Sequence, residues 1–338
     1  MEIQAAIKSV MARRDLSVEE MTSIMQQIMT GECTPSQIGG FLVGLRMKGE
    51  TVDELSAAAR VMRDLSTRVE VNCDNLVDTA GTGGDSSGSF NISTASAIVA
   101  AAAGAHVAKH GNRSMTSKSG SADVLETAGV KLDISPQKIG ECIEQVGVGF
   151  MFAPAHHGAM KHAIGPRREM AVRTVFNVLG PLTNPAGAPN QVIGVFDGEM
   201  VELLARVLRQ LDSRHVMVVH GEDGMDEISI SAPTQVAELK NGEVTSYTLS
   251  PADFGMETAP LESLKVDSAE QSLAMIRSVL ADQAGPARDI VCLNAGAAIY
   301  VAGCAESLAA GVDAARAAIS SGKAAAVLDD LVARTNAA

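Results

Sequence analysis

The chain has 338 residues, of which 46% are hydrophobic and 20% charged, and 27 Lys and Arg against 40 Asp and Glu give a net charge of −13. This composition is typical of a globular protein, and the length exceeds the roughly 250–300 residues at which one core stops growing. We therefore expect two domains, or one domain with a helical appendage. The acidic balance argues against a protein that binds nucleic acid by neutralising phosphates.

Membrane insertion and disulfide bonding are both poorly supported. The longest apolar stretch, near 95–105, is Ala-rich and shorter than the about 20 residues that a bilayer requires, and the N-terminus lacks a cleavable secretory pattern. The cysteines are odd in number, widely spaced and without a C-x-x-C pair, which argues against a disulfide framework or a zinc site. We expect a cytoplasmic protein without membrane partners.

Residues 1–68 are predicted to form a small helical domain. Three helix-start signals recur there, each followed by apolar residues at spacings of three and four. Short connections between such helices favour antiparallel packing, and a glycine follows each of the first two helices. The signals are Ser17 with Glu20, Thr34-Pro35 with Gln37, and Thr51 with Glu54, and the glycines are Gly31 and Gly49.

Residues 69–338 are predicted to form a larger α/β domain with a mainly parallel sheet flanked by helices. Short β-prone runs at 76–79, 107–109, 215–220 and 290–294 alternate there with longer Ala-rich helical stretches. A segment from about 165 to 185 also looks helical, and we expect it to pack on the N-terminal helices.

A glycine-rich turn follows the first predicted strand. The sequence D-T-A-G-T-G-G-D at 78–85 is followed by N-I-S-T at 91–94, where a helix is expected to begin. Glycines allow close backbone approach, and a helix start offers unpaired N–H groups to an anion, so this turn is a candidate phosphate site. It matches neither the dinucleotide nor the P-loop pattern. A tight turn with Asn91 or Ser93 as the helix N-cap is the alternative.

A second polar cluster, K-H-G-N-R-S-M-T-S-K-S-G-S at 109–121, begins at the end of the next predicted strand. Ligands of open α/β sheets bind at the carboxyl ends of the strands, so two such loops can converge on one phosphate-bearing ligand. Lys109 and Arg113 would supply fixed positive charge. A solvated charged loop is the alternative.

Asp226 and Glu227 follow the predicted strand at 215–220. Mg²⁺ is typically held by one or two carboxylates together with substrate phosphates, although an acidic surface turn would have the same sequence. The metal interpretation gains weight only from the two anion loops.

Two other groups stand between the predicted strands. Arg167 could grip a substrate carboxylate with two hydrogen bonds, or form an ordinary surface salt bridge. His156 and His157 are adjacent, which is not the i, i+4 spacing of a helical zinc site.

Taken together, the chain resembles the anthranilate phosphoribosyltransferase family. The resemblance rests on the ordered motifs G-T-G-G-D, N-I-S-T, K-H-G-N-R with S-G-S-A-D-V-L-E, R-T-x-F-N-x-L-G-P-L-x-N-P, D-E and N-A-G-A-A-I-Y-V-A-G, and it spans nearly the whole chain. It implies a homodimer with a small helical domain and a larger α/β domain. It also implies Mg²⁺-dependent transfer of phosphoribose from 5-phosphoribosyl 1-diphosphate to the amine of anthranilate, a step of tryptophan biosynthesis.

The resemblance also implies the site residues. Around the phosphoribosyl diphosphate it places Gly81, Gly84, Asp85, Ser89, Asn91, Ile92, Ser93, Thr94, Lys109, His110, Gly111, Asn112, Arg113, Ser114, Met115, Thr116, Ser117 and Ser121. Facing anthranilate it places Gly81, Asn112, His157 and Arg167, with His110 and His157 lining the channel, and as magnesium ligands Ser93, Asp226 and Glu227. Lys109, His110 and Arg113 are the expected catalytic residues. Thr116 stands where the family usually has serine, and His156 where an aromatic is frequent.

Loss of diphosphate builds oxocarbenium character at ribose C1 and negative charge on the leaving group, which Lys109, Arg113 and loop N–H groups can stabilise. The aromatic amine is already a neutral nucleophile, so we hypothesise that no single side chain is an essential general base.

Two alternatives to this function stay open. One is a pyrimidine nucleoside phosphorylase, whose chains are usually longer, and the other is a non-catalytic nucleic-acid-binding relative, which the acidic charge disfavours.

Overall fold

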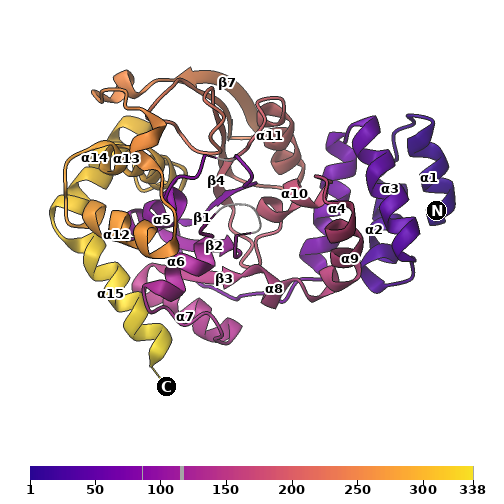
Figure 1. Cartoon of the computed structure of the whole chain (residues 1–338), viewed down its shortest axis with the longest axis horizontal. Coiled ribbons are helices and arrows are strands. Elements are labelled where there is room, and N and C mark those ends of the chain that lie inside the picture. The colour runs from indigo at the N-terminus through magenta and orange to yellow at the C-terminus, as the bar shows by residue number, and fades with distance from the viewer. Residues whose placement is uncertain (86, 115–117, 338) are drawn as a thin grey trace.

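The computed structural model describes residues 1–85, 87–114 and 118–337. Four helices at the N-terminus form a bundle beside a larger body built around a β-sheet (Figure 1). The helices are α1 (Ile3–Met11), α2 (Val18–Thr30), α3 (Pro35–Lys48) and α4 (Val52–Asp64). The predicted fold class, a small helical domain plus a mainly parallel α/β domain, is confirmed.

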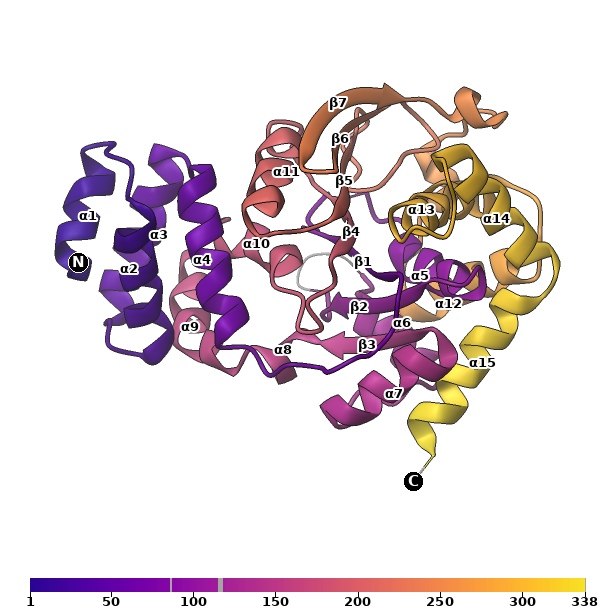
Figure 2. The same ribbon diagram turned by 180° about the vertical axis from the view of Figure 1, so that it is seen from behind.

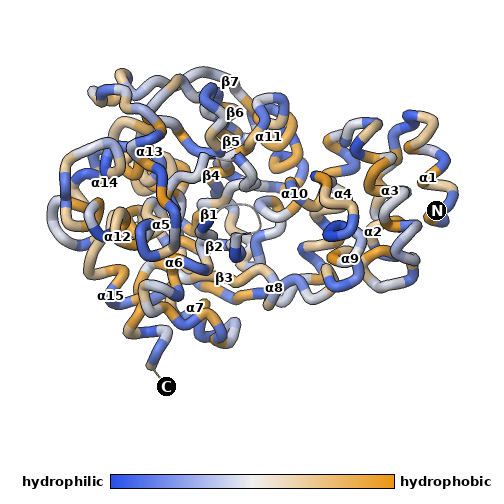
Figure 3. Tube along the Cα trace, viewed as in Figure 1, coloured by the Kyte–Doolittle hydropathy of each residue, from blue (hydrophilic) through white to orange (hydrophobic). Residues whose placement is uncertain are grey.

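The three helix-start signals of the bundle all form capping boxes. In each box the Ser or Thr side chain accepts a hydrogen bond from the backbone N–H of the third helical residue. The Glu or Gln side chain of that third residue accepts in turn from the backbone N–H of the Ser or Thr. Each cap is worth about 1 kcal/mol. Gly31 ends α2 with φ 84°, a left-handed conformation that a side chain would strain. Figure 3 shows hydrophobic and hydrophilic residues alternating along these helices, as one-sided burial requires.

The sheet formed by the described residues has seven strands in the order β3-β2-β1-β4-β5-β6-β7. The pairs from β3 to β5 are parallel, and β6 and β7 add an antiparallel hairpin at one edge. The carboxyl ends of five strands therefore meet at one edge of the sheet. The strands are β1 (Leu76–Gly81), β2 (His106–Gly111), β3 (Val148–Phe152), β4 (Asn190–Gly194), β5 (His215–Gly221), β6 (Thr234–Lys240) and β7 (Glu243–Leu249).

Two hydrophobic cores lie on opposite faces of the sheet, and β5 shows the alternation between them. Met217 and Val219 join the core that contains α5 (Ile92–Ala102) and α13 (Pro286–Val301). Val216 and Val218 join the core that contains α11 (Met200–Gln210) and the N-terminal bundle. The bundle and the sheet thus share one continuous core. The first core is also enclosed by α6 (Ser121–Thr127), α12 (Ala269–Leu280), α14 (Leu308–Ser320) and α15 (Lys323–Asn336), while α7 (Pro136–Val146) packs beside β3.

The segment from about 165 to 185 contains α9 (Lys161–Met170), which begins a few residues earlier, and the short α10 (Phe176–Leu179). Helix α9 contacts α2 and α3, and both views show it on the bundle side of the molecule (Figures 1 and 2). Short α8 (Ala153–His156) connects β3 to this region. Across the same boundary, Arg63 of α4 donates to the carbonyl of Leu182 at 2.7 Å.

The expected strand at 290–294 is wrong, because these residues lie within helix α13. A short apolar run does not distinguish a buried strand from a buried helix, and Pro286 at the first helical position was the signal for a helix. Helix α13 packs against both α5 and α14 and is buried along most of its length. Among the described residues no helix has the length and apolar character needed to cross a membrane.

A buried carboxylate joins the edge hairpin to α13. Glu238 of β6 accepts hydrogen bonds from Tyr247 at 2.7 Å and Tyr300 at 2.8 Å, and its carboxylate lies 2.7 Å from Nε2 of His215. Burial alone would raise the pKa of Glu238, but these hydrogen bonds outweigh it and lower the pKa to about 2.

This lowered pKa predicts an acid-dependent loss of stability. The stabilisation from Glu238 is complete above the carboxyl's unfolded pKa, 4.5, and is lost as the pH falls toward 2. Between pH 5 and pH 3 the free energy of unfolding should fall by about 1–2 kcal/mol more in the natural protein than in Glu238→Gln. Urea denaturation at several pH values measures this, and parallel pH profiles would contradict it.

Candidate functional site

The two polar loops that follow β1 and β2 meet at the carboxyl edge of the sheet. The side-chain amide of Asn91 donates to the carbonyl of Ser119 at 3.1 Å, and the Ser119 hydroxyl donates back to Asn91 at 2.9 Å. Ser272 of α12 also donates to Asn91 at 2.7 Å. The convergence expected from the topology therefore occurs, with Asn91 as the link between the loops.

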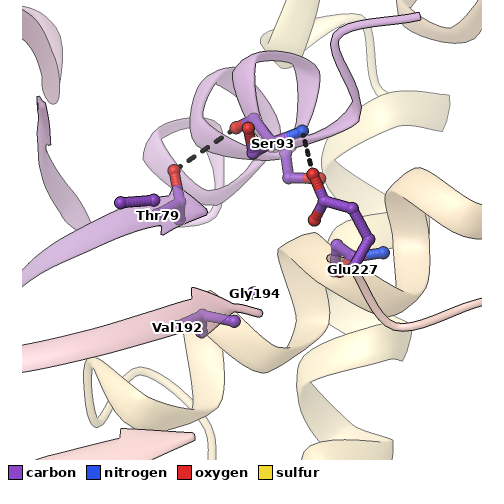
Figure 4. Close-up of a pocket in the computed structure, with 8 residues that line it drawn as sticks. Thr79, Ser93, Val192, Gly194 and Glu227 are labelled. Atoms are coloured by element: carbon purple, nitrogen blue, oxygen red, sulfur yellow. Dashed lines mark hydrogen bonds between the residues drawn. The ribbon is translucent and has the colours of Figure 1, made fainter. Parts of the chain in front are cut away.

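The first turn of α5 faces the acidic segment after β5. Asn91 stands at the N-cap but makes no side-chain cap, and the N–H of Ser93 donates to Oε1 of Glu227 at 3.1 Å. Figure 4 shows this bond together with the one from the Thr79 hydroxyl to the Ser93 carbonyl, 3.3 Å long. A carboxylate on a helix start is favoured both by its unpaired N–H groups and by the helix dipole.

Lys109 lies beneath this turn and is only 3% exposed. Its ammonium donates to the carbonyl of Thr79 at 2.5 Å and to the Ser93 hydroxyl at 3.2 Å. Burial lowers the pKa of Lys109, against the opposing charges of Asp78 and Glu227. In this arrangement the lysine supplies a fixed positive centre under the predicted phosphate turn.

Asp226 and Glu227 are adjacent and partly buried. The Asp226 carboxylate accepts from the N–H of Gly83 at 2.8 Å, so the acidic segment touches the glycine-rich turn directly. Burial, and then the charge of Asp85, raises the pKa of Asp226 to about 7, and burial with the charge of Asp226 raises that of Glu227 to about 8. Asp78, Asp226 and Glu227 all act on Lys109, so full ionisation of these three carboxyls would leave excess negative charge, and the raised pKa values reflect this.

This donor set fits Mg²⁺. Within the described residues no group of three or more His, Cys, Asp or Glu side chains is placed to hold a metal alone. Asp226, Glu227 and the Ser93 hydroxyl offer only hard oxygen donors, and Mg²⁺ commonly takes its remaining ligands from water and substrate phosphate. A divalent cation would also offset the excess negative charge of the three carboxylates.

Two glycines at paired strand ends form a floor under the acidic segment. Gly81 of β1 is the register partner of Gly194 of β4. A Cβ on Gly81 would lie 2.5 Å from Oδ2 of Asp226, and a Cβ on Gly194 would overlap the Asp226 carbonyl. A side chain at Gly194 would collide with the Asp226 backbone, and one at Gly81 would displace the Asp226 carboxylate.

Two buried histidines stand side by side behind the second loop. The rings of His110 and His157 meet edge to face with centroids 5.0 Å apart, and His110 donates its backbone N–H to Asp78 at 3.2 Å. Burial lowers the pKa of His110 to about 3 and that of His157 to about 4, so both are neutral near pH 7. Within the described part of the chain neither Nε2 atom has a hydrogen-bond partner.

The two predicted arginines lie in different settings. Arg113 lies in the loop after β2, where it is paired with two carboxylates of α6, Asp123 at 3.1 Å and Glu126 at 2.5 Å. Arg167 lies on α9, where its guanidinium stands 5.4 Å from the ring centroid of Phe176. The structure therefore places Arg167 beside the helical bundle rather than on a strand-end loop.

The other residues expected around the phosphoribosyl diphosphate lie mostly on the same two loops. Asp85 adds its charge beside Asp226, and the Arg113 N–H donates to the side chain of Asn112 at 2.7 Å. Met115, Thr116 and Ser117 fall outside the described residues. The remaining members occupy the first loop (Gly84, Ser89), the start of α5 (Ile92, Thr94), the end of β2 and the loop after it (Gly111, Ser114) and the start of α6 (Ser121).

Sequence reasoning missed two residues at this edge. Arg173 donates to the carbonyl of Gly84, and its guanidinium lies 3.7 Å from the ring centroid of Phe196. Asn294 of α13 borders the same small cavity as Ser93 and Glu227. Both open motifs that carry the family resemblance, but neither was given a role: Arg173 was one cation among several in its stretch, and Asn294 stood in a run taken for a strand.

Comparison with known proteins gives a consistent result. Residues 4–66 match the helical bundle domain of a glycosyl transferase family, and residues 73–325 match that family's α/β domain. Anthranilate phosphoribosyltransferase of Thioalkalivibrio sulfidiphilus is 70% identical over 335 residues, with 99% of each chain covered. The corresponding protein of Cellvibrio japonicus is 58% identical over 339 residues, again with 99% of each covered.

Solved structures agree. The crystal structure of anthranilate phosphoribosyltransferase from Thermus thermophilus is 44% identical and superposes with a TM-score of 0.93, covering 98% of this chain and 99% of that one. The Saccharomyces cerevisiae enzyme in complex with PRPP and Mg is 24% identical with a TM-score of 0.89, covering 98% and 97%. At 24% identity, the similarity to the yeast enzyme shows only that the two chains share a fold.

The glycine floor predicts a selective cost for a single methyl group. Gly194→Ala should lower the free energy of unfolding by at least about 1–3 kcal/mol, because the new Cβ displaces the backbone of Asp226. Gly165→Ala on α9 is the matched control: a Cβ there meets nothing within 4 Å, and a helical alanine should add about 0.5–1 kcal/mol. Urea denaturation compares them, and equal effects would refute the floor.

Proposed function

The chain belongs to the anthranilate phosphoribosyltransferase family, and from that premise we propose how its own residues carry out the family's reaction. In this reaction the phosphoribosyl group of 5-phosphoribosyl 1-diphosphate passes to the amine of anthranilate, and diphosphate leaves, within L-tryptophan biosynthesis. The observation that carries the assignment is the likeness over 99% of the chain to a named relative at 70% identity. The converging anion loops give it a physical basis in this structure.

The phosphoribosyl diphosphate is proposed to bind at the carboxyl edge of the sheet. The glycine turn and the start of α5 offer backbone N–H groups, and Lys109 lies beneath them as a fixed cation. The same loops carry the members of the set named from the sequence, with Asn91 holding the two loops together. Arg113 would serve the diphosphate by leaving its partners Asp123 and Glu126, since its side chain is about half exposed.

Mg²⁺ is proposed to bind between Ser93, Asp226 and Glu227 and the diphosphate. The support is the oxygen-only donor set, the crowding of carboxyls that raises the pKa values of Asp226 and Glu227, and the Mg in the named yeast complex. When bound, the ion would neutralise charge on the departing diphosphate. The protein's part is to hold the two carboxylates in place before substrate arrives, through the N–H groups of Gly83 and Ser93.

Anthranilate is proposed to enter between the sheet edge and the bundle side of the molecule. Arg167 on α9 would grip its carboxylate, and Gly81, Asn112 and His157 would face the ring. Neutral His110 and His157 line an uncharged path, which suits an aromatic ring and a neutral amine. Placing the amine near ribose C1 is itself a large part of such catalysis.

The chemistry requires little proton transfer before the bond is made. The bond from ribose C1 to the diphosphate oxygen breaks, the amine nitrogen forms the new bond to C1, and its surplus proton leaves afterward. Burial holds the pKa of His110 at about 3, far below the range in which a general base works well near pH 7. Lys109, Arg113 and the loop N–H groups act instead by stabilising charge.

Replacing the acidic pair should abolish turnover. Asp226→Asn with Glu227→Gln should reduce the magnesium-dependent consumption of anthranilate, followed by its fluorescence, by about 10²–10³-fold or more, because the leaving charge loses its support. Asp329→Asn with Asp330→Asn removes two adjacent exposed carboxylates from α15 and is the matched control, which should retain full activity.

Three outcomes of the same assay are informative. No consumption by the folded natural protein would overturn the activity and bring forward a nucleoside phosphorylase. Turnover in the acidic-pair variant equal to the control would overturn the metal assignment. The variant His110→Ala should keep measurable turnover, and a loss as complete as that of the acidic pair would contradict the absence of an essential base.

A homodimer is proposed to form through the N-terminal bundle. Met11 at the end of α1 and Met47 on α3 are 74% and 72% exposed, and Val43 lies one turn before Met47. Gly44 packs against Val10, so these exposed apolar side chains stand on neighbouring helices. We further propose that residues 1–68, with a contribution from about 165–185, form the bundle domain, that 69–338 form the catalytic domain, and that the enzyme works in the cytoplasm.

The dimer face can be tested by charge. Val43→Glu with Met47→Glu should convert the protein to a monomer in sedimentation velocity, because buried like charges at a symmetric interface repel. Leu65→Glu at the end of α4, where the leucine is also exposed, is the control and should leave the mass unchanged. A natural protein that sediments as a monomer would overturn the proposal.

A further inference from the structure

Asn294 makes a reciprocal pair of hydrogen bonds with the backbone next to the acidic pair. Its Oδ1 accepts from the N–H of Ile228 at 2.9 Å, and its Nδ2 donates to the carbonyl of Ile228 at 2.9 Å. The same Nδ2 donates to the carbonyl of Ile290, one turn earlier in α13, at 2.9 Å. Asn294 is 3% exposed, and Ile228 directly follows Glu227 in the chain.

The acidic segment is thereby held from three directions. Gly194 lies directly under the backbone of Asp226, and Gly81 lies under its carboxylate. The Gly83 and Ser93 N–H groups fix the two carboxylates from the side of the glycine turn and α5. Asn294 fixes the far end of the segment at Ile228, whose side chain is buried in the core around α13. The position of Glu227 relative to Ser93 therefore depends on a residue of the C-terminal part of the chain.

Helix stability alone does not explain an asparagine at this position. Between Ile290 and Ile299 it is the one residue with a side-chain amide, hydroxyl or charge. Alanine is a better helix former than asparagine, and a buried amide is costly unless its hydrogen bonds are made. Two of its three bonds go to Ile228 rather than to its own helix. The local benefit therefore lies in the acidic segment.

We propose that Asn294 is a positioning residue that holds Asp226 and Glu227 in the geometry for binding Mg²⁺ together with phosphoribosyl diphosphate. The inference rests on the metal assignment of the proposed function. Groups that orient metal ligands are often as important as the ligands, and their removal typically costs about 10–100-fold in metal affinity. Asn294 itself touches neither reacting group.

The test uses Asn294→Ala, which removes both bonds to Ile228 while alanine suits the interior of α13. Asn190→Ala is the matched control. Asn190 is also 3% exposed and donates its amide to a carbonyl, that of Leu76 at 2.9 Å, but it stands at the opposite end of β4 from the site. Mn²⁺ serves as a paramagnetic probe, titrated with phosphoribosyl diphosphate present, and its binding is read by electron paramagnetic resonance.

The expected result is a loss of Mn²⁺ affinity of about 10–100-fold in Asn294→Ala, with the natural affinity kept by Asn190→Ala. The Mg²⁺ concentration for half-maximal turnover should rise with it, and amide hydrogen exchange at Ile228 should become faster. A loss smaller than threefold relative to Asn190→Ala overturns the inference. If Asn294→Ala does not fold, Asn294→Ser replaces it, because a serine hydroxyl is too short to make both bonds.

The natural protein separates this inference from the proposed function. If the natural protein neither binds Mn²⁺ in this assay nor consumes anthranilate, the proposed function fails and the inference fails with it. If the natural protein does both and Asn294→Ala matches it, only the role of Asn294 is overturned.

Discussion

The site depends on the crowding of carboxyl groups at the carboxyl edge of a parallel sheet. Asp226 and Glu227 are partly buried there, with Asp85 nearby and Lys109 as counter-charge. Such crowding costs less when donors hold the carboxyls, and the Gly83 and Ser93 N–H groups each hold one oxygen of the pair. Glycines at the ends of β1 and β4, the helix start of α5 and the polar loops are all arranged around this requirement.

The two cations near the site, Lys109 and Arg113, differ in burial and in their hydrogen-bond partners. Lys109 is buried and immobile, with its ammonium bonded to Thr79 and Ser93, whereas Arg113 is exposed and paired with carboxylates of α6. A lysine in a fixed position stabilises charge without reorganising, and a guanidinium on an exposed loop can change partners. In the proposed site, a fixed positive charge would lie below the diphosphate and an adjustable cation at the edge.

Sequence alone predicted features that are encoded locally. The capping boxes and Gly31 were predicted because their partners lie three or four residues away, and the convergence of the two polar loops because the carboxyl ends of parallel strands meet at one edge. The β6–β7 hairpin was missed although Asn241-Gly242 marks its turn, with φ of 53° and 80°. The run 290–294 was misassigned because its four consecutive apolar residues fit either period. The role of Asn294 could not be predicted from the sequence, because its partner is the backbone of Ile228, 66 positions away.

The two family domains do not correspond to two separate hydrophobic cores. The two family domains meet near residue 70, yet Val216 and Val218 of the sheet pack in the same cluster as Ile24 and Leu42 of the bundle. Arg63 also bonds to the carbonyl of Leu182 across that boundary. The family domains are therefore two, but they share one core, and a fragment cut at the domain boundary would expose the apolar surfaces of α9 and α11 that pack against the bundle. Exchanging either domain for that of a distant relative would require the whole interface between the two domains to be repacked.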